Sequence, residues 1–229
     1  MIDSILQAMR ADCVPESEAG LWYVKKCQIH GHEKERFDAK NEKNFSSNYR
    51  CEYPPPGQYT YLFRWTEATR FGSVIDPKAH GELVMNDFPG ELKKHLQFIL
   101  KARGRVLVTG LGLGCVVRGL LHHGRVDTID IVERDANVIK LCGHSVEHPK
   151  VRIIKCDATV FEPEGAYDFA WHDLWSDGDK NEENLHLIHM RLMIRMMDHV
   201  PTQGAWAFGH RFKRTLPEFH LKPARRTRK

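Results

Sequence analysis

Three glycines at alternate positions carry the clearest chemical signal in the sequence. The segment VLVTGLGLG runs from an apolar stretch into Gly110, Gly112 and Gly114. Glycine has no Cβ atom, so the backbone of such a loop can approach a ligand closely. Where a helix follows, its first N–H groups are unpaired and can bind a polar or anionic group. The loop therefore indicates a nucleotide-like ligand, although a tight turn from a strand into a helix would need the same glycines.

The spacing of the loop separates several classes of nucleotide site. A phosphate-binding P-loop would end in Gly-Lys-Ser/Thr, and this loop does not. A dinucleotide fingerprint counted from Gly110 would place its third small residue at 115, where Cys115 stands. Cys115 and the later Asp157 disfavour a nicotinamide-dependent oxidoreductase.

Acidic residues follow the next three apolar stretches. Glu133 lies twenty-three residues after Gly110, where a carboxylate can accept both hydroxyls of a ribose. Asp157 follows the next stretch, in KCDA, within reach of an adenine amino group. Asp173 follows the fourth stretch, in DFAWHDLW. We expect these carboxylates to lie along one edge of a parallel sheet, beside the glycine loop.

The elements that must position these residues are predicted by hydrophobic periodicity. From residue 105 onward, short apolar strands alternate with amphipathic helices, which is typical of a doubly wound, mostly parallel sheet. A long helix is predicted at about 182–199. Strands are predicted at 106–108, 128–132, 151–154, 167–171 and 205–208.

The chain before this core has a different pattern of apolar and polar residues. Apolar residues at helical spacing predict a short helix at the N-terminus, and Pro54 to Gly57 interrupts regular structure. Candidate strands at 59–65, 73–75 and 82–85 predict a small antiparallel β unit, followed by a helix that begins at Pro89. The expected domains are a polar N-terminal segment with a short helix (1–57), the β unit with its lead-in helix (58–102), the core (103–210) and a basic tail (211–229).

The motifs VLVTGLGLG, DIVERD, KCDA and DFAWHDLW, in this order, resemble those of class I S-adenosylmethionine (SAM)-dependent methyltransferases. The resemblance covers about residues 103–210. It implies a Rossmann-like doubly wound sheet with SAM as the cofactor. The last strands of that fold would be abbreviated, because only a short basic tail follows residues 205–208.

The resemblance also implies roles for single residues. Asp173 would be the catalytic base, with His172 as the other candidate, because adjacent strand residues face opposite ways and only one can point into the site. The acceptor substrate would meet Trp175 and Asp177. The residues implied to bind the cofactor are Gly110, Leu111, Gly112, Gly114, Glu133, Asp157 and Ala158.

Within this superfamily the sequence is most similar to spermidine-synthase-like proteins, which also place a small β unit before the core. The segments FGSVID and LVMND, with Glu91 and His95, carry this resemblance. Two features depart from it: the usual glycine-aspartate loop is replaced by Gly-Leu-Gly-Leu-Gly, and the fourth motif reads His-Asp-Leu-Trp. These departures favour methyl transfer over aminopropyl transfer.

Three functions therefore stay open. The first is methyl transfer from SAM to an unidentified acceptor. The second is aminopropyl transfer from decarboxylated SAM to a polyamine, which an acidic rim at Asp177 and Asp179 would suit. The third is a non-catalytic binding module that keeps the fold and holds a partner through its basic tail.

Composition and charge limit the remaining possibilities. The 229 residues are 41% hydrophobic and 28% charged, as in an ordinary globular chain. No apolar run approaches the roughly 20 residues of a membrane span, and the N-terminus does not resemble a secretory signal. We therefore expect a cytoplasmic protein that does not enter a membrane. Six scattered cysteines without a CxxC pair predict reduced thiols.

Partners and metals leave weaker signals. Cys27, His30 and His32 match no zinc-finger spacing, so no metal is expected. Residues 211–229 hold eight Lys or Arg against one acidic residue, so the tail could contact nucleic acid or another polyanion. The β unit could pair with its copy in a homodimer.

Overall fold

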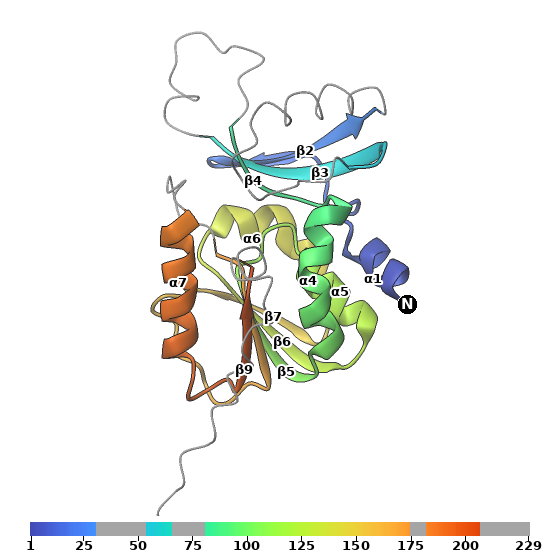
Figure 1. The fold of residues 1–229 in the computed structure, drawn as a ribbon. Coiled ribbons are helices and arrows are strands. Elements are labelled where there is room, and N and C mark those ends of the chain that lie inside the picture. Colours follow the sequence, from blue (N-terminus) through green and yellow to red (C-terminus); the bar gives the residue numbers. More distant parts are fainter. Residues whose placement is uncertain (31–53, 66–80, 175–181, 207–229) are drawn as a thin grey trace, which may run out of the picture. The chain divides into compact units, whose positions relative to one another are not determined.

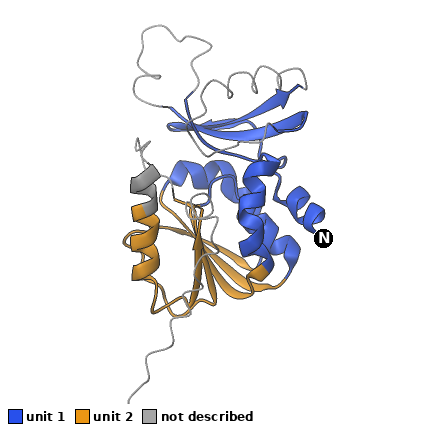
Figure 2. Ribbon diagram, in the orientation of Figure 1, with its two compact units in different colours: residues 1–100, 111–124, 135–149 blue, residues 101–110, 125–134, 150–229 orange. Residues whose placement is uncertain are grey.

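The computed structural model describes residues 1–30, 54–65, 81–174 and 182–206 (Figure 1). The chain divides into two compact units, coloured separately in Figure 2. The first unit comprises residues 1–100, 111–124 and 135–149, and the second comprises 101–110, 125–134 and 150–229. In the described residues, no helix has the length and the apolar character that crossing a bilayer would require.

The second unit contains a parallel five-stranded sheet. Its strands are β5 (Gly104–Thr109), β6 (Val126–Glu133), β7 (Val151–Lys155), β8 (Phe169–His172) and β9 (Thr202–Ala205). They run in the spatial order β7-β6-β5-β8-β9, and each neighbouring pair is parallel. Counted along the chain this order is 3-2-1-4-5, that of a Rossmann-type sheet. The predicted α/β fold with a mostly parallel sheet is confirmed.

Two strand positions differ from the prediction. The fourth strand was expected at 167–171, but β8 begins at Phe169 because the Tyr167 N–H donates to His199 O, outside the sheet. The fifth was expected at 205–208, and β9 occupies Thr202–Ala205, so it begins three residues earlier; residues 207 and 208 of that prediction lie outside the described residues. In β9, Gly204 lies against the indole ring of Trp171, where a side chain would have little room.

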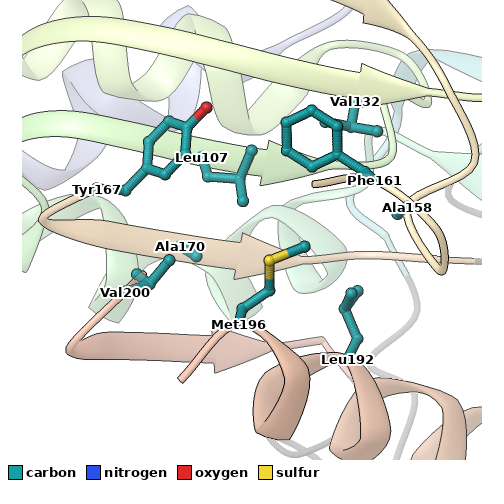
Figure 3. Close-up of a cluster of buried hydrophobic side chains, with 9 residues drawn as sticks. All are labelled: Leu107, Val132, Ala158, Phe161, Tyr167, Ala170, Leu192, Met196 and Val200. Carbon is teal, nitrogen blue, oxygen red and sulfur yellow. The ribbon is translucent and has the colours of Figure 1, made fainter. Parts of the chain in front are cut away.

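A cluster of buried apolar side chains forms the core of the second unit (Figure 3). The sheet contributes Leu107, Val132 and Ala170. Helix α7 (Glu182–Arg195) and the turn after it contribute Leu192 and Met196, at the spacing of one helical turn. Leu107 and Val132 alternate along their strands with residues of the opposite face, so the cluster marks the face of the sheet on which α7 packs. The remaining members are Ala158, Phe161, Tyr167 and Val200.

The first unit contains an antiparallel sheet in the order β1-β2-β3-β4. The strands are β1 (Ser17–Ala19), β2 (Trp22–Ile29), β3 (Gly57–Arg64) and β4 (Glu82–Asn86). The strands predicted at 59–65 and 82–85 are confirmed, and the one predicted at 73–75 lies outside the described residues. Sequence reasoning missed β1 and β2, which precede residue 58. The first three residues of β2 are apolar, and polar residues follow them. The strand is stabilised by pairing with β3, from Trp22 opposite Arg64 to Ile29 opposite Gly57.

The helices of the first unit include two that connect the parallel strands along the chain. α5 (Cys115–His123) lies between β5 and β6 in the sequence, and α6 (Ala136–Cys142), followed by the 3₁₀ turn η1 (Gly143–Val146), lies between β6 and β7. The others are α1 (Ile2–Met9), which confirms the predicted N-terminal helix, and α4 (Pro89–Lys101).

Asp87 fixes the end of β4. Its carboxylate is fully buried and accepts hydrogen bonds from Arg10 Nε (2.9 Å), the Ala11 N–H (2.9 Å) and the Thr60 N–H (2.8 Å). One side chain therefore joins the end of β4 to β3 and to the segment after α1. Met85, two residues before Asp87, contacts the glycine loop. The hydrogen bonds of Asp87 therefore also fix the strand end that meets this loop.

Candidate functional site

The carboxyl edge of the parallel sheet brings together four of the predicted residues within the second unit. Gly110 follows β5, Glu133 ends β6, Asp157 follows β7 and Asp173 follows β8. Parallel strands end at the same edge, and the chain order of the strands reverses between β5 and β8. Such a switch point is where open α/β sheets bind ligands.

The ends of β5 and β8 approach closely at this switch point. The Asp173 N–H donates to Thr109 O (2.9 Å), and the Gly110 N–H donates to Val132 O (2.9 Å). Gly110 has φ +92°, and a Cβ atom there would collide with the carbonyl oxygen of Asp173. Any other residue at 110 would therefore be strained and would push these two strand ends apart.

The rest of the glycine loop belongs to the first unit. Gly112 has φ +50°, and a Cβ atom there would collide with the Met85 sulfur. The Leu113 N–H donates to the same sulfur at 3.2 Å. Gly114, with φ +77°, is the N-cap of α5, and its N–H donates to the carbonyl of the buried Leu111. The Met85 thioether of β4 therefore covers the loop backbone at Gly112 and Leu113.

Arg118 also binds the glycine loop. Its Nη1 donates to Leu113 O (2.8 Å) and to Ser145 Oγ (2.9 Å), and its Nη2 donates to Met9 O (2.9 Å). Neither Arg118 nor Met85 was predicted from the sequence as a residue of this site. The available signal for Arg118 was a lone arginine in the apolar start of α5, four residues after Gly114.

Asp157 has one oxygen engaged and one open. Its Oδ1 accepts hydrogen bonds from the Thr159 N–H (2.8 Å) and Thr159 Oγ1 (2.7 Å). The Thr159 hydroxyl and N–H lower the pKa of Asp157, so its carboxylate is charged at neutral pH. Within the described part of the chain, Oδ2 has no hydrogen bond. This oxygen can therefore accept from a ligand without losing an internal partner.

Glu133 and Ala158 differ in where their side chains lie. Glu133 is half-buried at the end of β6 and alternates with Val132, so its side chain is on the face opposite the core cluster of Figure 3. Its carbonyl accepts from the Cys156 N–H (3.1 Å), which joins the ends of β6 and β7. Ala158 is buried in that cluster, and its carbonyl accepts from Arg195 Nη2 (2.7 Å). Its side chain therefore packs in the core, whereas that of Glu133 does not.

His172 is fully buried, and both ring nitrogens have partners. Gln203 donates through Nε2 to Met193 O and Val200 O, so its Oε1 is the acceptor for His172 Nε2 (3.0 Å). The ring proton is then on Nε2, and Nδ1 accepts from the Thr109 hydroxyl (2.9 Å). Burial lowers the pKa of His172 to about 4, although the bond with Gln203 opposes this shift. The neutral ring joins β5, β8 and β9 and has no free nitrogen for a substrate.

Asp173 is half-buried and directly follows His172. The structure therefore gives these two candidate bases different surroundings: one ring enclosed by Thr109 and Gln203, and one carboxylate at the switch point. The predicted substrate residues Trp175 and Asp177 lie outside the described residues, as do His32 and the basic tail. Across residues 1–30, 54–65, 81–174 and 182–206, no three His, Cys, Asp or Glu side chains gather as a metal site would require.

The chain matches no protein-family model and no curated protein sequence. Among solved structures, it is similar to the N-methyltransferase NodS from Bradyrhizobium japonicum WM9, with 11% identity, a TM-score of 0.39, and coverage of 48% of this chain and 60% of that one. The 23S rRNA methyltransferase ErmE gives 16% identity and a TM-score of 0.39 over 50% of this chain and 43% of its own. A dimethyladenosine transferase from Plasmodium falciparum gives 18% identity and a TM-score of 0.38 over 51% of this chain and 40% of its own. The chain thus spans 60% or less of each structure, and its fold is established here by its own strand order.

Proposed function

We propose that the chain is a SAM-dependent methyltransferase whose acceptor is unidentified. The observation that carries this proposal is the carboxyl edge of a 3-2-1-4-5 parallel sheet. A glycine turn ends its first strand, and Glu133, Asp157 and Asp173 end or follow the next three. We include the spermidine-synthase-like subgroup in the proposal because a small antiparallel sheet precedes the parallel one in the chain.

The donors and acceptors at this edge fit the parts of SAM. The Glu133 carboxylate can accept two ribose hydroxyls, and Asp157 Oδ2 can accept from the adenine amino group while Oδ1 stays with Thr159. Gly110, which directly follows β5, would supply backbone beside the amino-acid part. The cofactor, when bound, supplies an electrophilic methyl group on a sulfonium.

The residues of the chain would then align the acceptor and remove its proton. Methyl transfer is an in-line displacement, so most of the acceleration comes from orientation. Asp173 is the residue that we assign as the base, because its carboxylate directly follows β8 at the switch point. His172 would act as a positioning residue, since its bond to Thr109 connects the strand end before Gly110 with the strand end before Asp173.

Calorimetric titration with SAM tests the proposal. The wild-type chain is compared with Glu133→Gln and with a matched control, Asp127→Asn, which changes an exposed acid on the same strand at its other end. We expect micromolar binding by the wild type and by Asp127→Asn. Glu133→Gln should bind about 10 to 100 times more weakly, because charged hydrogen bonds to the ribose are lost.

Parallel titrations with decarboxylated SAM and NAD separate the alternatives. Preference for decarboxylated SAM would overturn methyl transfer and direct the search to polyamines. Preference for NAD would identify an oxidoreductase. A folded chain that binds none of the three would mean that the loop is only a turn, and the binding-module hypothesis would replace the proposal.

A further inference from the structure

Met85 fills the space that the missing Cβ atom of Gly112 leaves on the glycine loop. A Cβ atom at Gly112 would collide with the Met85 sulfur, and the Leu113 N–H donates to the same sulfur at 3.2 Å. Met85, Gly112 and Leu113 all belong to the first unit. The close approach that glycine allows at this turn is therefore already used by a side chain of the chain itself.

A shift in the register of the antiparallel sheet determines the face on which Met85 lies. The register pairs Leu62 with Met85 but Phe63 with Leu83, so β4 contains one more residue than β3 at this point. Adjacent residues of β3 face opposite sides of the sheet, and the side chains of Met85 and Leu83 therefore do so as well. Leu83 is 41% exposed, whereas Leu62 is fully buried. The shift thus places Met85 on the face of Leu62, away from the exposed Leu83.

The backbones on both sides of this contact are held by other hydrogen bonds. Arg118 Nη1 donates to Leu113 O (2.8 Å), which fixes the loop. Two residues after Met85, the Asp87 carboxylate accepts from three donors, which fixes the end of β4. The Met85 side chain is therefore the part of this contact that can move when a ligand needs the loop backbone.

The contact of Met85 with the loop is weak and adaptable. A thioether sulfur is a weak hydrogen-bond acceptor, whereas a carboxylate oxygen makes short, charge-assisted bonds to backbone N–H groups. Methionine is unbranched and has three rotatable side-chain bonds, so its sulfur can leave without a change in the backbone. A ligand carboxylate can therefore replace the Met85 sulfur on the Leu113 N–H at little cost.

We propose that Met85 is a displaceable cover of the cofactor site and lowers its affinity for SAM. In the free chain the thioether occupies the loop at Gly112 and Leu113, and it leaves when the amino-acid carboxylate of SAM binds there. This inference rests on the proposed function and adds a residue that sets the affinity of the same site. SAM affinity should then depend on how well the side chain at position 85 binds the loop.

Calorimetric titration with SAM compares two substitutions that have opposite expected effects. Met85→Ala removes the cover and should bind SAM about three to ten times more tightly than the wild type. Met85→Gln keeps a similar length and offers the Leu113 N–H a stronger acceptor, so its SAM affinity should fall about three- to tenfold. Leu83→Ala is the matched control, because it truncates the exposed side chain on the other face of β4, and its affinity should stay within about twofold of the wild type.

The signs of these effects separate a cover from a support. A residue that only supports the loop would weaken SAM binding when it is replaced by either Ala or Gln. Met85→Ala that binds SAM no more tightly than the wild type would therefore overturn this inference and leave the proposed function in place. Absence of SAM binding by every folded protein, Met85→Ala included, would instead overturn the proposed function and this inference with it. Should Met85→Ala lose its thermal transition, Met85→Leu is measured instead, with tighter binding again expected.

Nuclear magnetic resonance observes the displacement directly, in chain labelled with ¹⁵N and with ¹³C at the methionine methyl groups. The chain has seven methionines, and the Met85 methyl signal is assigned by its absence from the spectrum of Met85→Gln. We expect a nuclear Overhauser effect between this methyl group and the Leu113 amide in the free chain, and its loss at saturating SAM. A contact that persists in the complex would show that Met85 is a fixed wall of the site and would overturn the proposed displacement.

Discussion

Two aspartates of the parallel sheet differ in how fully their oxygens are used. Asp130, within β6, accepts from Arg152 Nε at Oδ1 (2.9 Å) and, at Oδ2, from Arg152 Nη2 (3.0 Å), Arg105 Nη2 (3.0 Å) and Tyr167 Oη (2.7 Å). Asp157, after β7, is bound at Oδ1 by Thr159 alone. Both belong to the second unit, and their sequence contexts gave little indication of this contrast.

The pKa shifts reflect the same contrast. Burial by itself raises the pKa of Asp130, but the hydrogen bonds from Arg152, Tyr167 and Arg105 together outweigh it and lower the pKa. Burial and the bond to Asp130 raise the pKa of Tyr167 to about 12. The charge of Asp130 is thus neutralised inside the unit, which makes it a structural residue. A carboxylate such as Asp157, with an oxygen still available, is the better candidate for a ligand.

The largest effect is expected for Asp130→Asn. The amide removes the charge that two guanidinium groups share and turns a donor toward them, so the free energy of unfolding should fall by about 4 kcal/mol. Urea unfolding followed by circular dichroism measures this. SAM affinity of the folded variant should stay within about twofold of the wild type, because Asp130 lies three residues before Glu133 and on the opposite face of β6. A variant of normal stability would show that the four hydrogen bonds do not stabilise the unit.

The second effect concerns His172, whose buried ring is neutral. Its pKa of about 4 in the folded chain lies below about 6.5 in the unfolded chain, so the unfolded chain binds more protons between these values. Stability from this group is therefore complete above about pH 6.5 and is lost as the pH falls toward 4, by about 3 kcal/mol in total. The measurement is urea unfolding at several pH values, with His172→Asn as the reference that keeps an acceptor for Thr109.

The difference in unfolding free energy between wild type and His172→Asn isolates this ring from the other histidines. It should shrink by about 3 kcal/mol between pH 7 and pH 4. A difference that stays constant over this range would mean that the ring becomes protonated in the folded chain without penalty.

The sequence predicted the parallel sheet well because its signals are local. Each of the first four strands contains a short apolar run, and an acid directly after such a run must lie at the carboxyl edge of a parallel sheet. Gly110, Glu133, Asp157 and Asp173 could therefore be placed on that edge from spacing alone, whereas their ligand remains a proposal.

The parts that could not be predicted depend on contacts between distant residues. The partners of His172 are Thr109 and Gln203, which are 63 and 31 residues away in the chain. Met85 contacts Leu113 across 28 residues. Nothing in the local pattern distinguishes an enclosed histidine at the end of a strand from an accessible one, so the sequence alone predicts His172 as a candidate base.

Asp157→Asn tests the open oxygen directly. The amide oxygen can still accept from Thr159, while an NH₂ group replaces Oδ2 and would face the adenine amino group. SAM affinity should fall about tenfold, with stability changed by less than about 1 kcal/mol. Thr159→Val is the matched control, because it removes one bond to Oδ1 and leaves the carboxylate in place. Equal affinity losses in the two variants would indicate that the turn geometry matters and that Oδ2 does not bind the ligand.

The smallest effect is expected for Arg152→Met. Arg152 is the cationic partner of Asp130 in the ion pair that Asp130→Asn breaks. The Arg152 side chain is 51% exposed, so water screens its interaction and solvates Asp130 Oδ1 once the guanidinium is gone. Asp130 Oδ2 keeps Arg105 and Tyr167. The free energy of unfolding should therefore fall by only about 1 kcal/mol, measured in the same urea experiment. A loss as large as that of Asp130→Asn would mean that Arg152, rather than the shared carboxylate, holds this end of the sheet together.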